Sequence, residues 1–425
     1  MSLNGIKQQL TSTRPAGVVG PKYLRLAPPE SINLHRTLWA RNHPRIPRVA
    51  WWPLQGVALA RWTTRRAAVE TRLWVDHCAA AIEESEGIPR DEQFKSVMRL
   101  ARRHAIHPSE TYELGLYRQG GASSWADFVY DRESGAFNEW RSTRFASLGE
   151  YLEGIRTLSN KPRLTSLSEG WGIGTPTTLL RVDRADPAAA SKILGLAFRE
   201  GKLFLKPTSG SAGRGAFAIR VDAGSPDGLA VRTWGDLSWT VVETEQYVTG
   251  QLGKVAYLVQ RPLISDDFFR SFSAGWNQDV VTLRIITNSE RSGLDPVWHA
   301  LLELPRTPVD GGRLSYFLLP VDVLSGRVRS PYEPSWMAGT RASADPNLRA
   351  LVGSEVPGWA AILKALSRGH QALSGVASIS WDVALTRDGP VLLEGNSGFA
   401  LVRPQAMAGP LLVNCGRHPR PPMAR

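Results

Sequence analysis

The feature that most constrains the fold is a pair of apolar runs joined by an Asp-Gly pair near the C-terminal end of the sequence. The runs cover residues 379–385 and 391–394, and Asp388 and Gly389 lie between them. An Asp-Gly pair favours the tight turn of a β-hairpin because both residues tolerate the backbone conformations that such turns need. We therefore expect two adjacent antiparallel strands here, and a fold that contains an antiparallel sheet.

Polar side chains interrupt both strands of this expected hairpin. Asp382 lies between Trp381 and Val383, and Glu394 follows three apolar residues. Because side chains alternate along a strand, Glu394 and Asn396 share a face, and Asp382 can lie across from Glu394. Three oxygen ligands of this kind suit Mg²⁺. The alternative is a pair of carboxylates on a solvated face, but their apolar neighbours weigh against it, since an unpaired buried carboxylate is costly.

A second candidate site follows the apolar run 203–205. Lys206 comes next, and residues 209–215 form a loop of Ser, Gly, Ala and one Arg. Glycines let backbone N–H groups converge on phosphate oxygens, while a lysine supplies a point charge. The loop is neither a Walker A motif nor a dinucleotide fingerprint, because it lacks the closing Gly-Lys-Ser/Thr and an obvious following helix. A Gly-rich turn of no function explains it equally well.

The remaining pattern mixes helices with short strands. We expect strands at residues 216–221, 256–259 and 280–287 and a helix that starts after Pro357. A helix beginning at Asp91 should end at Pro108 and carry His104 and His107 on one face, with no third residue at metal-ligand spacing. The mixture indicates an α+β fold with antiparallel sheets.

Charge and cysteine content exclude several classes of protein. The chain of 425 residues carries a net charge of +12, but 11 of those charges lie in residues 1–50 and 401–425, so the body is balanced. A nucleic-acid partner is therefore not expected, since it would require a basic excess on the folded face. Two cysteines are too few for a disulfide framework, and residues 1–20 lack an apolar signal segment, so we expect a cytoplasmic protein.

The N-terminal segment, residues 1–84, is rich in Trp and Arg. Helices that pack against the main body, with Arg side chains covering them, are the favoured interpretation. An amphipathic helix at a membrane surface, or on a partner, is the alternative. The longest apolar stretch near the N-terminus has 12 residues and is too short to span a bilayer.

Taken together, these motifs resemble the ATP-grasp superfamily, and most closely its sugar-transfer-associated group. The resemblance extends over about residues 160–412. It includes the following motifs in order: Asn160-Lys161, residues 172–176, Lys206 with its Gly-rich loop, residues 257–261, residues 282–287, and Asp382, Glu394 and Asn396.

The resemblance implies a role for each motif. ATP would be bound by Lys161, Lys206, Ser209, Gly210, Ser211, Gly213, Gly215, Val259 and Gln260. Asp382, Glu394 and Asn396 would hold Mg²⁺, with Mn²⁺ as a substitute ion, and Lys206 and Arg284 would be the catalytic side chains. A structural ion pair on a strand is the alternative for Arg284, and a plain surface lysine is the alternative for Lys161.

The fold implied is two α+β lobes that grip ATP between antiparallel sheets, behind a helical N-terminal extension. The expected divisions are a basic extension (1–84), a preceding domain (85–160), a small lobe with the Gly-rich loop (161–262), a large lobe with the magnesium site (263–415) and a basic tail (416–425). Oligomeric state is left open.

The function implied is ligation of a small-molecule carboxylate, activated as an acylphosphate, to an amine or thiol, with release of ADP and phosphate. A phosphotransferase acting on a sugar or other hydroxyl group, and a non-catalytic scaffold that retains the fold, are the alternatives. Residues 302–315 depart from the group's pattern on the acceptor side of the cleft, so the carboxylate and the nucleophile are not identified.

Overall fold

The computed structural model describes most of the chain, with gaps in the N-terminal part, several loops and the C-terminal tail. The described residues are 30–41, 48–183, 186, 188–208, 215–221, 229–232, 236–238, 240–270, 280–293, 295–306, 315–334 and 345–412. Ser209, Gly210, Ser211 and Gly213, which the resemblance assigns to ATP, lie outside these residues, as does the basic tail.

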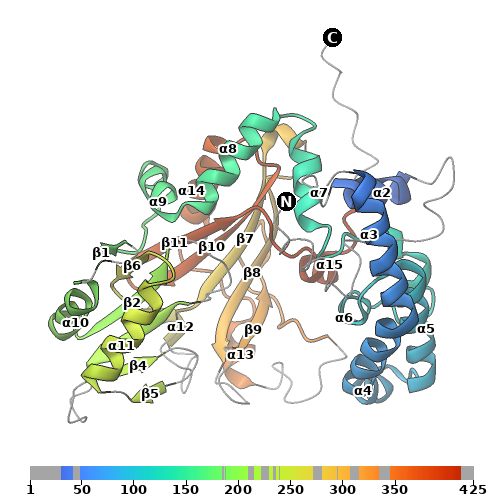
Figure 1. Ribbon diagram of the computed structural model, residues 1–425, viewed down its shortest axis with the longest axis horizontal. Coiled ribbons are helices and arrows are strands. Elements are labelled where there is room, and N and C mark those ends of the chain that lie inside the picture. The colour runs from blue at the N-terminus through green and yellow to red at the C-terminus, as the bar shows by residue number, and fades with distance from the viewer. Residues whose placement is uncertain are drawn as a thin grey trace.

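The N-terminal part of the structure is a layer of helices at one side of the molecule (Figure 1). It contains α2 (Glu30–Arg41), α3 (Arg48–Arg61), a π-helical turn (Trp62–Arg66), α4 (Ala67–Glu86), α5 (Arg90–His104) and α6 (Pro108–Glu113). Helices α4 and α5 enclose a small core that includes Cys78, Ile82 and Val97. The described parts of residues 1–84 are thus helical, and none of the described helices has the length and hydrophobicity needed to cross a bilayer.

The expectation that one helix carries both His104 and His107 is wrong. Helix α5 ends at His104 because Ala105 adopts a left-handed conformation, with φ of 55°. Pro108 occupies the first turn of α6, where its missing N–H is not needed. His107 caps α6 and accepts a hydrogen bond from the Ser109 N–H, so the two histidines belong to different elements.

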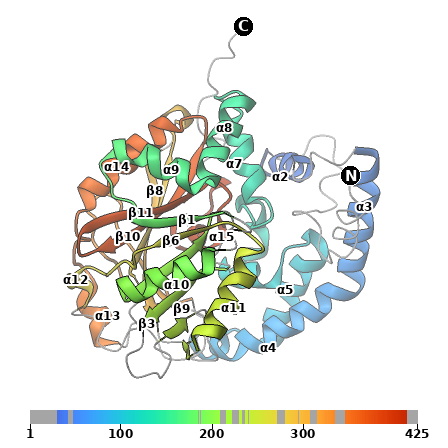
Figure 2. The same cartoon turned by 60° about the vertical axis from the view of Figure 1, so that its left-hand side comes forward.

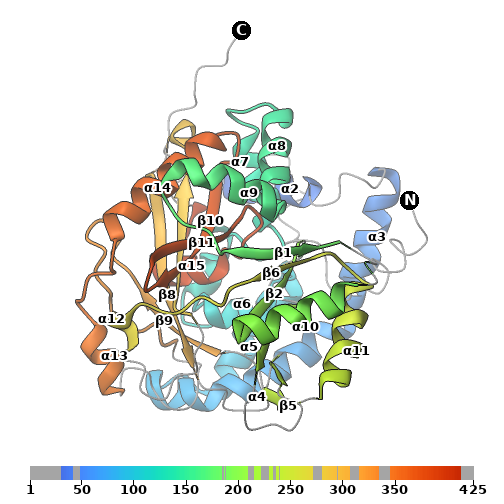
Figure 3. The same cartoon turned by 90° about the vertical axis from the view of Figure 1, so that its left-hand side faces the viewer.

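A six-stranded antiparallel sheet forms the small lobe, with order β1-β6-β2-β3-β4-β5. Its strands are β1 (Thr178–Val182), β2 (Lys202–Pro207), β3 (Phe217–Val221), β4 (Leu229–Arg232), β5 (Asp236–Ser238) and β6 (Tyr257–Gln260). Helices α10 (Ala189–Glu200) and α11 (Val241–Leu252) share one apolar core with this sheet. Figure 3 shows both helices in front of the strands that they cover.

A five-stranded antiparallel sheet forms the large lobe, with order β11-β10-β7-β8-β9. Its strands are β7 (Thr282–Asn288), β8 (Val297–Arg306), β9 (Ser315–Pro320), β10 (Ser378–Thr386) and β11 (Gly389–Asn396). Apolar residues of α8 (Leu148–Ser159), α9 (Lys161–Ser168), α13 (Pro346–Leu351) and α14 (Trp359–Ala372) pack on one face of it. The strands expected at 203–205, 216–221, 256–259, 280–287, 379–385 and 391–394, and the helix after Pro357, are confirmed within one or two residues.

Three further helices connect these layers. They are α7 (Ser134–Ser142), α12 (Asp267–Arg270) and α15 (Val402–Ala408). The side chain of Asn138 on α7 binds the backbone of Ser378 in both directions, with distances of 2.8 and 2.9 Å. The start of β10 is therefore fixed to the N-terminal layer, and Figure 2 shows α7 and α8 lying between that layer and the sheets.

A buried ion pair fastens α2 to the rest of the N-terminal layer. Nδ1 of His35 lies 3.0 Å from both carboxylate oxygens of Glu133, and Nε2 lies 3.1 Å from the Ala126 carbonyl. Both ring nitrogens thus face acceptors, which favours the doubly protonated ring. Burial alone would lower the pKa of His35, but Glu133, the Ala126 carbonyl and Asp127 outweigh it and raise the pKa above 6.5.

The free energy of unfolding should therefore fall as pH rises above about 6.5. A raised pKa in the folded state means that protonated His35 stabilises the fold fully below the unfolded pKa, and that this contribution is lost as pH rises through the folded pKa. Chemical denaturation between about pH 6 and pH 7.5 measures it, because the lowered pKa of Lys161, about 8, makes the free energy of unfolding rise again at higher pH. The His35→Gln variant should lose this dependence and about 3–5 kcal/mol at the acid end.

The matched control is His77→Gln, because His77 lies exposed on α4. This control should keep the pH dependence of the unmodified chain. A free energy of unfolding that rises over the same pH range, or an equal dependence in His35→Gln, would show that the pair does not work this way.

Candidate active site

Two carboxylates face each other across the β10–β11 hairpin. Asp382 on β10 is the direct partner of Glu394 on β11, and the register shifts immediately after this pair. Asn396 lies two residues beyond Glu394 and donates a 3.2 Å hydrogen bond from Nδ2 to Glu394 Oε1. The shared face expected from the sequence is therefore observed.

The residue between Glu394 and Asn396 is a glycine that packs closely against the core. Gly395 points to the opposite face of the sheet, where a Cβ would lie 2.7 Å from Trp381 and 2.8 Å from Leu158. Contacts this short do not occur between real carbon atoms. The polar side chains of β11 are thus set by close packing of the strand on the core behind them.

Arg284 enters the same face from the other neighbour of β10. It is the direct partner of Asp382 in the β7–β10 pairing. Its Nε and Nη2 donate to the two oxygens of Asp382 at 2.8 and 3.3 Å, and its Nη1 lies 3.3 Å from Glu303 on β8. Arg284 therefore bridges two carboxylates.

Two lysines reach this face from outside the large sheet. Nζ of Lys206, on β2 of the small lobe, lies 3.3 Å from Glu394 Oε2. Lys161 begins α9, and its Nζ donates a 3.1 Å hydrogen bond to the carbonyl of Pro207. The two lobes therefore meet through charged groups, and the Gly174 carbonyl also accepts a hydrogen bond from the N–H of Leu392.

Burial and charge change the acidity of these groups. The pKa of Lys161 falls to about 8, first because of burial and then because of repulsion by Lys206. Burial raises the pKa of Asp382 despite the attraction of Arg284. For Glu394, burial alone would raise the pKa, but Lys206, Asn396 and Lys161 together lower it. Two lysines held together in a partly buried site favour binding of an anion.

The Gly-rich segment is described only from Gly215 onwards. Gly215 has φ of +80°, and its carbonyl accepts a 2.9 Å hydrogen bond from the hydroxyl of Tyr257. A Cβ at this position would lie 3.2 Å from that hydroxyl and 3.3 Å from Pro207. The end of the loop is thereby fixed beside the strand that carries Lys206.

Val259 and Gln260 lie on β6, between β1 and β2. They are not part of the charged cluster, which consists of Asp382, Glu394, Arg284, Glu303, Lys206 and Lys161. The side chain of Val259 is fully buried in the small-lobe core. Gln260 donates a 3.4 Å hydrogen bond to the hydroxyl of Thr178, and the N–H of Arg261 donates to the Thr177 carbonyl. Any contact of Val259 with a nucleotide would therefore be through its backbone.

One member of the cluster, Glu303, was not singled out from the sequence. It lies on β8 in the run Leu301-Leu302-Glu303-Leu304, and its Oε2 accepts a 3.4 Å hydrogen bond from the hydroxyl of Thr282. An acid within an apolar strand is the same signal that identifies Asp382. What the sequence lacks is the register that brings this strand beside Arg284.

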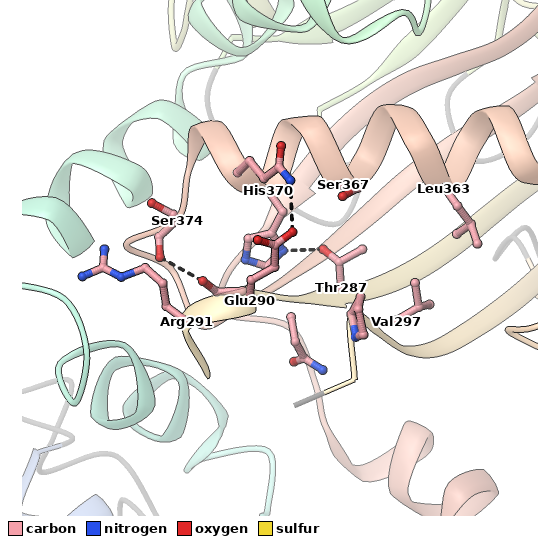
Figure 4. Close-up of a pocket in the computed structure, with 12 residues that line it drawn as sticks. Thr287, Glu290, Arg291, Val297, Leu363, Ser367, His370 and Ser374 are labelled. Atoms are coloured by element: carbon pink, nitrogen blue, oxygen red, sulfur yellow. Dashed lines mark hydrogen bonds between the residues drawn. The ribbon is translucent and has the colours of Figure 1, made fainter. Parts of the chain in front are cut away.

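A cavity of about 290 Å³ lies behind the sheet, between β7 and α14 (Figure 4). Thr287 faces it, three residues along β7 from Arg284 and therefore on the opposite face. The buried ring of His370 contacts the Thr287 hydroxyl at 2.6 Å and the Val376 carbonyl at 2.8 Å. Because the cavity lies behind the sheet, it is separate from the charged side chains on the other face, and its Thr287 and His370 are paired with each other.

The three oxygen-bearing side chains of the hairpin, Asp382, Glu394 and Asn396, fit a hard divalent cation by donor chemistry. Within the described residues no three His, Cys, Asp or Glu side chains gather as a metal site, and the third oxygen donor on this face is the amide of Asn396. Cationic side chains contact both carboxylates in the present structure, which marks the position as one that attracts positive charge.

The sequence matches one described protein family. A family model described as sugar-transfer-associated ATP-grasp matches residues 141–417. A comparison with curated proteins finds no match.

Three solved structures share a distant likeness. The ATP-grasp ligase PsnB bound to a minimal precursor is 13% identical, with a TM-score of 0.35, and 68% of this chain covers 69% of that one. D-alanyl-alanine synthetase A from Vibrio cholerae is 12% identical, with a TM-score of 0.34 and coverage of 61% and 63%. D-cycloserine synthetase DcsG is 14% identical, with a TM-score of 0.33 and coverage of 60% and 70%.

The packing behind Gly395 gives a stability prediction. Gly395→Ala should lower the free energy of unfolding by about 1–3 kcal/mol, because the added methyl group must displace Trp381 or Leu158. The control is Gly398→Ala, where nothing lies within 4 Å of the new Cβ, and its effect should stay below about 0.5 kcal/mol. Chemical denaturation measures both, and equal effects would contradict the packing argument.

Proposed function

Because the chain belongs to the sugar-transfer-associated ATP-grasp family, we propose that it is an ATP- and Mg²⁺-dependent ligase. It activates a carboxylate as an acylphosphate and joins it to an amine or a thiol, releasing ADP and phosphate. The observation that carries this proposal is the face on which Asp382, Glu394 and Asn396 meet Lys206 of the other lobe. Oxygen ligands beside lysines are what a magnesium-bound polyphosphate requires.

ATP lies between the two sheets in this proposal. Lys206 and Lys161 neutralise the α and β phosphates, and their partial burial makes each charge more effective than it is in water. Residues 209–215 cover the β and γ phosphates, and the fixed position of Gly215 beside Lys206 supports this. Val259 and Gln260 contribute to the adenine site at the end of β6.

Asp382, Glu394 and Asn396 hold Mg²⁺, and Mn²⁺ has the same preference for oxygen ligands. The bound ion neutralises phosphate charge during transfer. Binding it requires that Arg284 and Lys206 exchange their carboxylate partners for phosphate oxygens. Both side chains carry the charge for this, and each contacts one of the proposed metal-binding carboxylates, at 2.8 Å for Arg284 and 3.3 Å for Lys206.

The chemistry proceeds in two displacements. A carboxylate oxygen of the substrate attacks the γ-phosphorus, the bond to the β,γ-bridging oxygen breaks, and ADP leaves with the electron pair. Arg284 stabilises the transferring phosphoryl group. The amine or thiol then attacks the acyl carbon, phosphate leaves, and the nucleophile loses its proton. Catalysis rests on positioning and charge neutralisation, so no covalent protein nucleophile is needed.

A hydroxylamine assay tests this proposal. The protein is incubated with ATP, Mg²⁺, hydroxylamine and a panel of carboxylic acids, and ADP and hydroxamate are measured. Both products should appear with at least one acid, because hydroxylamine traps an acylphosphate. Mass spectrometry distinguishes the alternatives: a stable phosphorylated hydroxyl product would indicate a phosphotransferase, and ATP binding without any turnover would indicate a scaffold.

Variants of the site should separate metal binding from phosphate binding. Asp382→Asn should lower kcat by at least about 100-fold, and Lys206→Met should lower kcat/KM for ATP by a similar factor. The control is Lys192→Met, since Lys192 pairs with Asp186 at the surface of α10 and should leave activity unchanged. Full activity in Asp382→Asn would refute the proposed metal site.

A further inference from the structure

Arg284 is shared between two carboxylates that have different tasks. Asp382 is needed as a metal ligand in the proposed function, on which this inference rests, whereas Glu303 is not. We propose that Glu303 is a positioning residue for Arg284: it keeps the guanidinium group in the site when Asp382 turns to Mg²⁺. It thereby determines how readily Asp382 becomes available.

The hydrogen bonds of Arg284 are divided unequally between the two acids. A guanidinium group has five N–H donors. Nε and Nη2 contact both oxygens of Asp382, at 2.8 and 3.3 Å, while Nη1 alone contacts Glu303, at 3.3 Å. Both carboxylate oxygens of Asp382 therefore contact Arg284, and a metal ion has to compete with these two contacts for the oxygen lone pairs.

Glu303 is well placed to hold Arg284 during that exchange. Its side chain is 14% exposed, compared with 42% for Arg284. Its neighbours along β8, Leu302 and Leu304, are fully buried on the opposite face, which fixes the strand. The Thr282 hydroxyl donates to Oε2, so that Oε1 is presented to Arg284. Because Glu303 is held firmly, it remains a partner of Arg284 after Asp382 has turned to the metal ion.

Removing the charge of Glu303 should strengthen the dependence of Arg284 on Asp382. With a neutral residue at position 303, Asp382 is the carboxylate that remains beside the guanidinium group. Although Arg284 is 42% exposed, its two contacts with Asp382 would then be the carboxylate contacts that remain, so Arg284 should resist losing them. Binding of Mg²⁺ should weaken in consequence, although Glu303 is not one of the proposed metal ligands.

The test measures how far Mg²⁺ strengthens ADP binding. Calorimetry gives the dissociation constant of ADP for the full chain in Mg²⁺ and in EDTA. The constant in EDTA divided by the constant in Mg²⁺ measures how far the metal strengthens ADP binding. Glu303→Gln should reduce this ratio about tenfold. Glu303→Asp should reduce it less, because it keeps the charge on a shorter side chain, and it replaces Glu303→Gln if that variant unfolds.

Repeating the measurement in a protein that already carries Arg284→Gln separates this role from simple electrostatic attraction of the metal. In Arg284→Gln, the further change Glu303→Gln should alter the ratio by less than about twofold, because the residue acts through Arg284. An equal reduction in both backgrounds would show that Glu303 attracts the metal directly and would overturn the proposal. The control Glu139→Gln, which removes an acid paired with Arg41 on α2, should change nothing.

The outcomes also distinguish this inference from the proposed function. Failure of the unmodified chain to bind ADP, with or without Mg²⁺, would refute the proposed function itself. ADP binding that Mg²⁺ strengthens equally in the unmodified chain and in folded Glu303→Gln would refute the positioning role alone.

Discussion

The register of the β7–β10–β11 strands is the constraint on which the rest of the structure depends. One face of these strands carries Asp382, Glu394 and Arg284, and the other carries Trp381 and Leu392, which are buried under helices. A shift of one residue in any pairing would exchange the two faces and bury the charges. The close fit of Gly395 against the core holds this register, so packing on the apolar face positions the polar one.

Charge balance follows from that register. Lys206 and Arg284 each contact a carboxylate of the large sheet, and Lys206 comes from the other lobe. In the absence of a ligand the cluster neutralises itself and joins the lobes. A metal-bound polyphosphate carries both signs of charge. Its phosphates can replace the carboxylates as partners of Lys206 and Arg284, and its metal ion can replace these cations as the partner of the carboxylates. Binding at the proposed site therefore exchanges one set of ion pairs for another. No charge has to be buried without a partner, whether or not the ligand is bound.

Local patterns were sufficient to predict the hairpin, most of the strands and the shared face of Asp382 and Glu394, because each depends on residues close in sequence. Glu303 was missed because its contact with Arg284 depends on a pairing between strands, which no local pattern encodes. The shared helix face of His104 and His107 was wrong because Ala105 ends the helix in a left-handed conformation that alanine seldom adopts. Roles for the residues around the Gly-rich loop remain predictions.

Side chains near Glu303 join the N-terminal helices to the residues that follow the large sheet. Glu113 at the end of α6 contacts Arg403 on α15 and the hydroxyl of Tyr332, both at 3.3 Å. Arg403 is also near enough to Glu303 to lower its pKa, against the larger effect of burial. The N-terminal layer, through Glu113 on α6, thus contributes to the electrostatic surroundings of the site. Arg403 belongs to the basic C-terminal segment, and its pairing with Glu113 balances that charge beside the site.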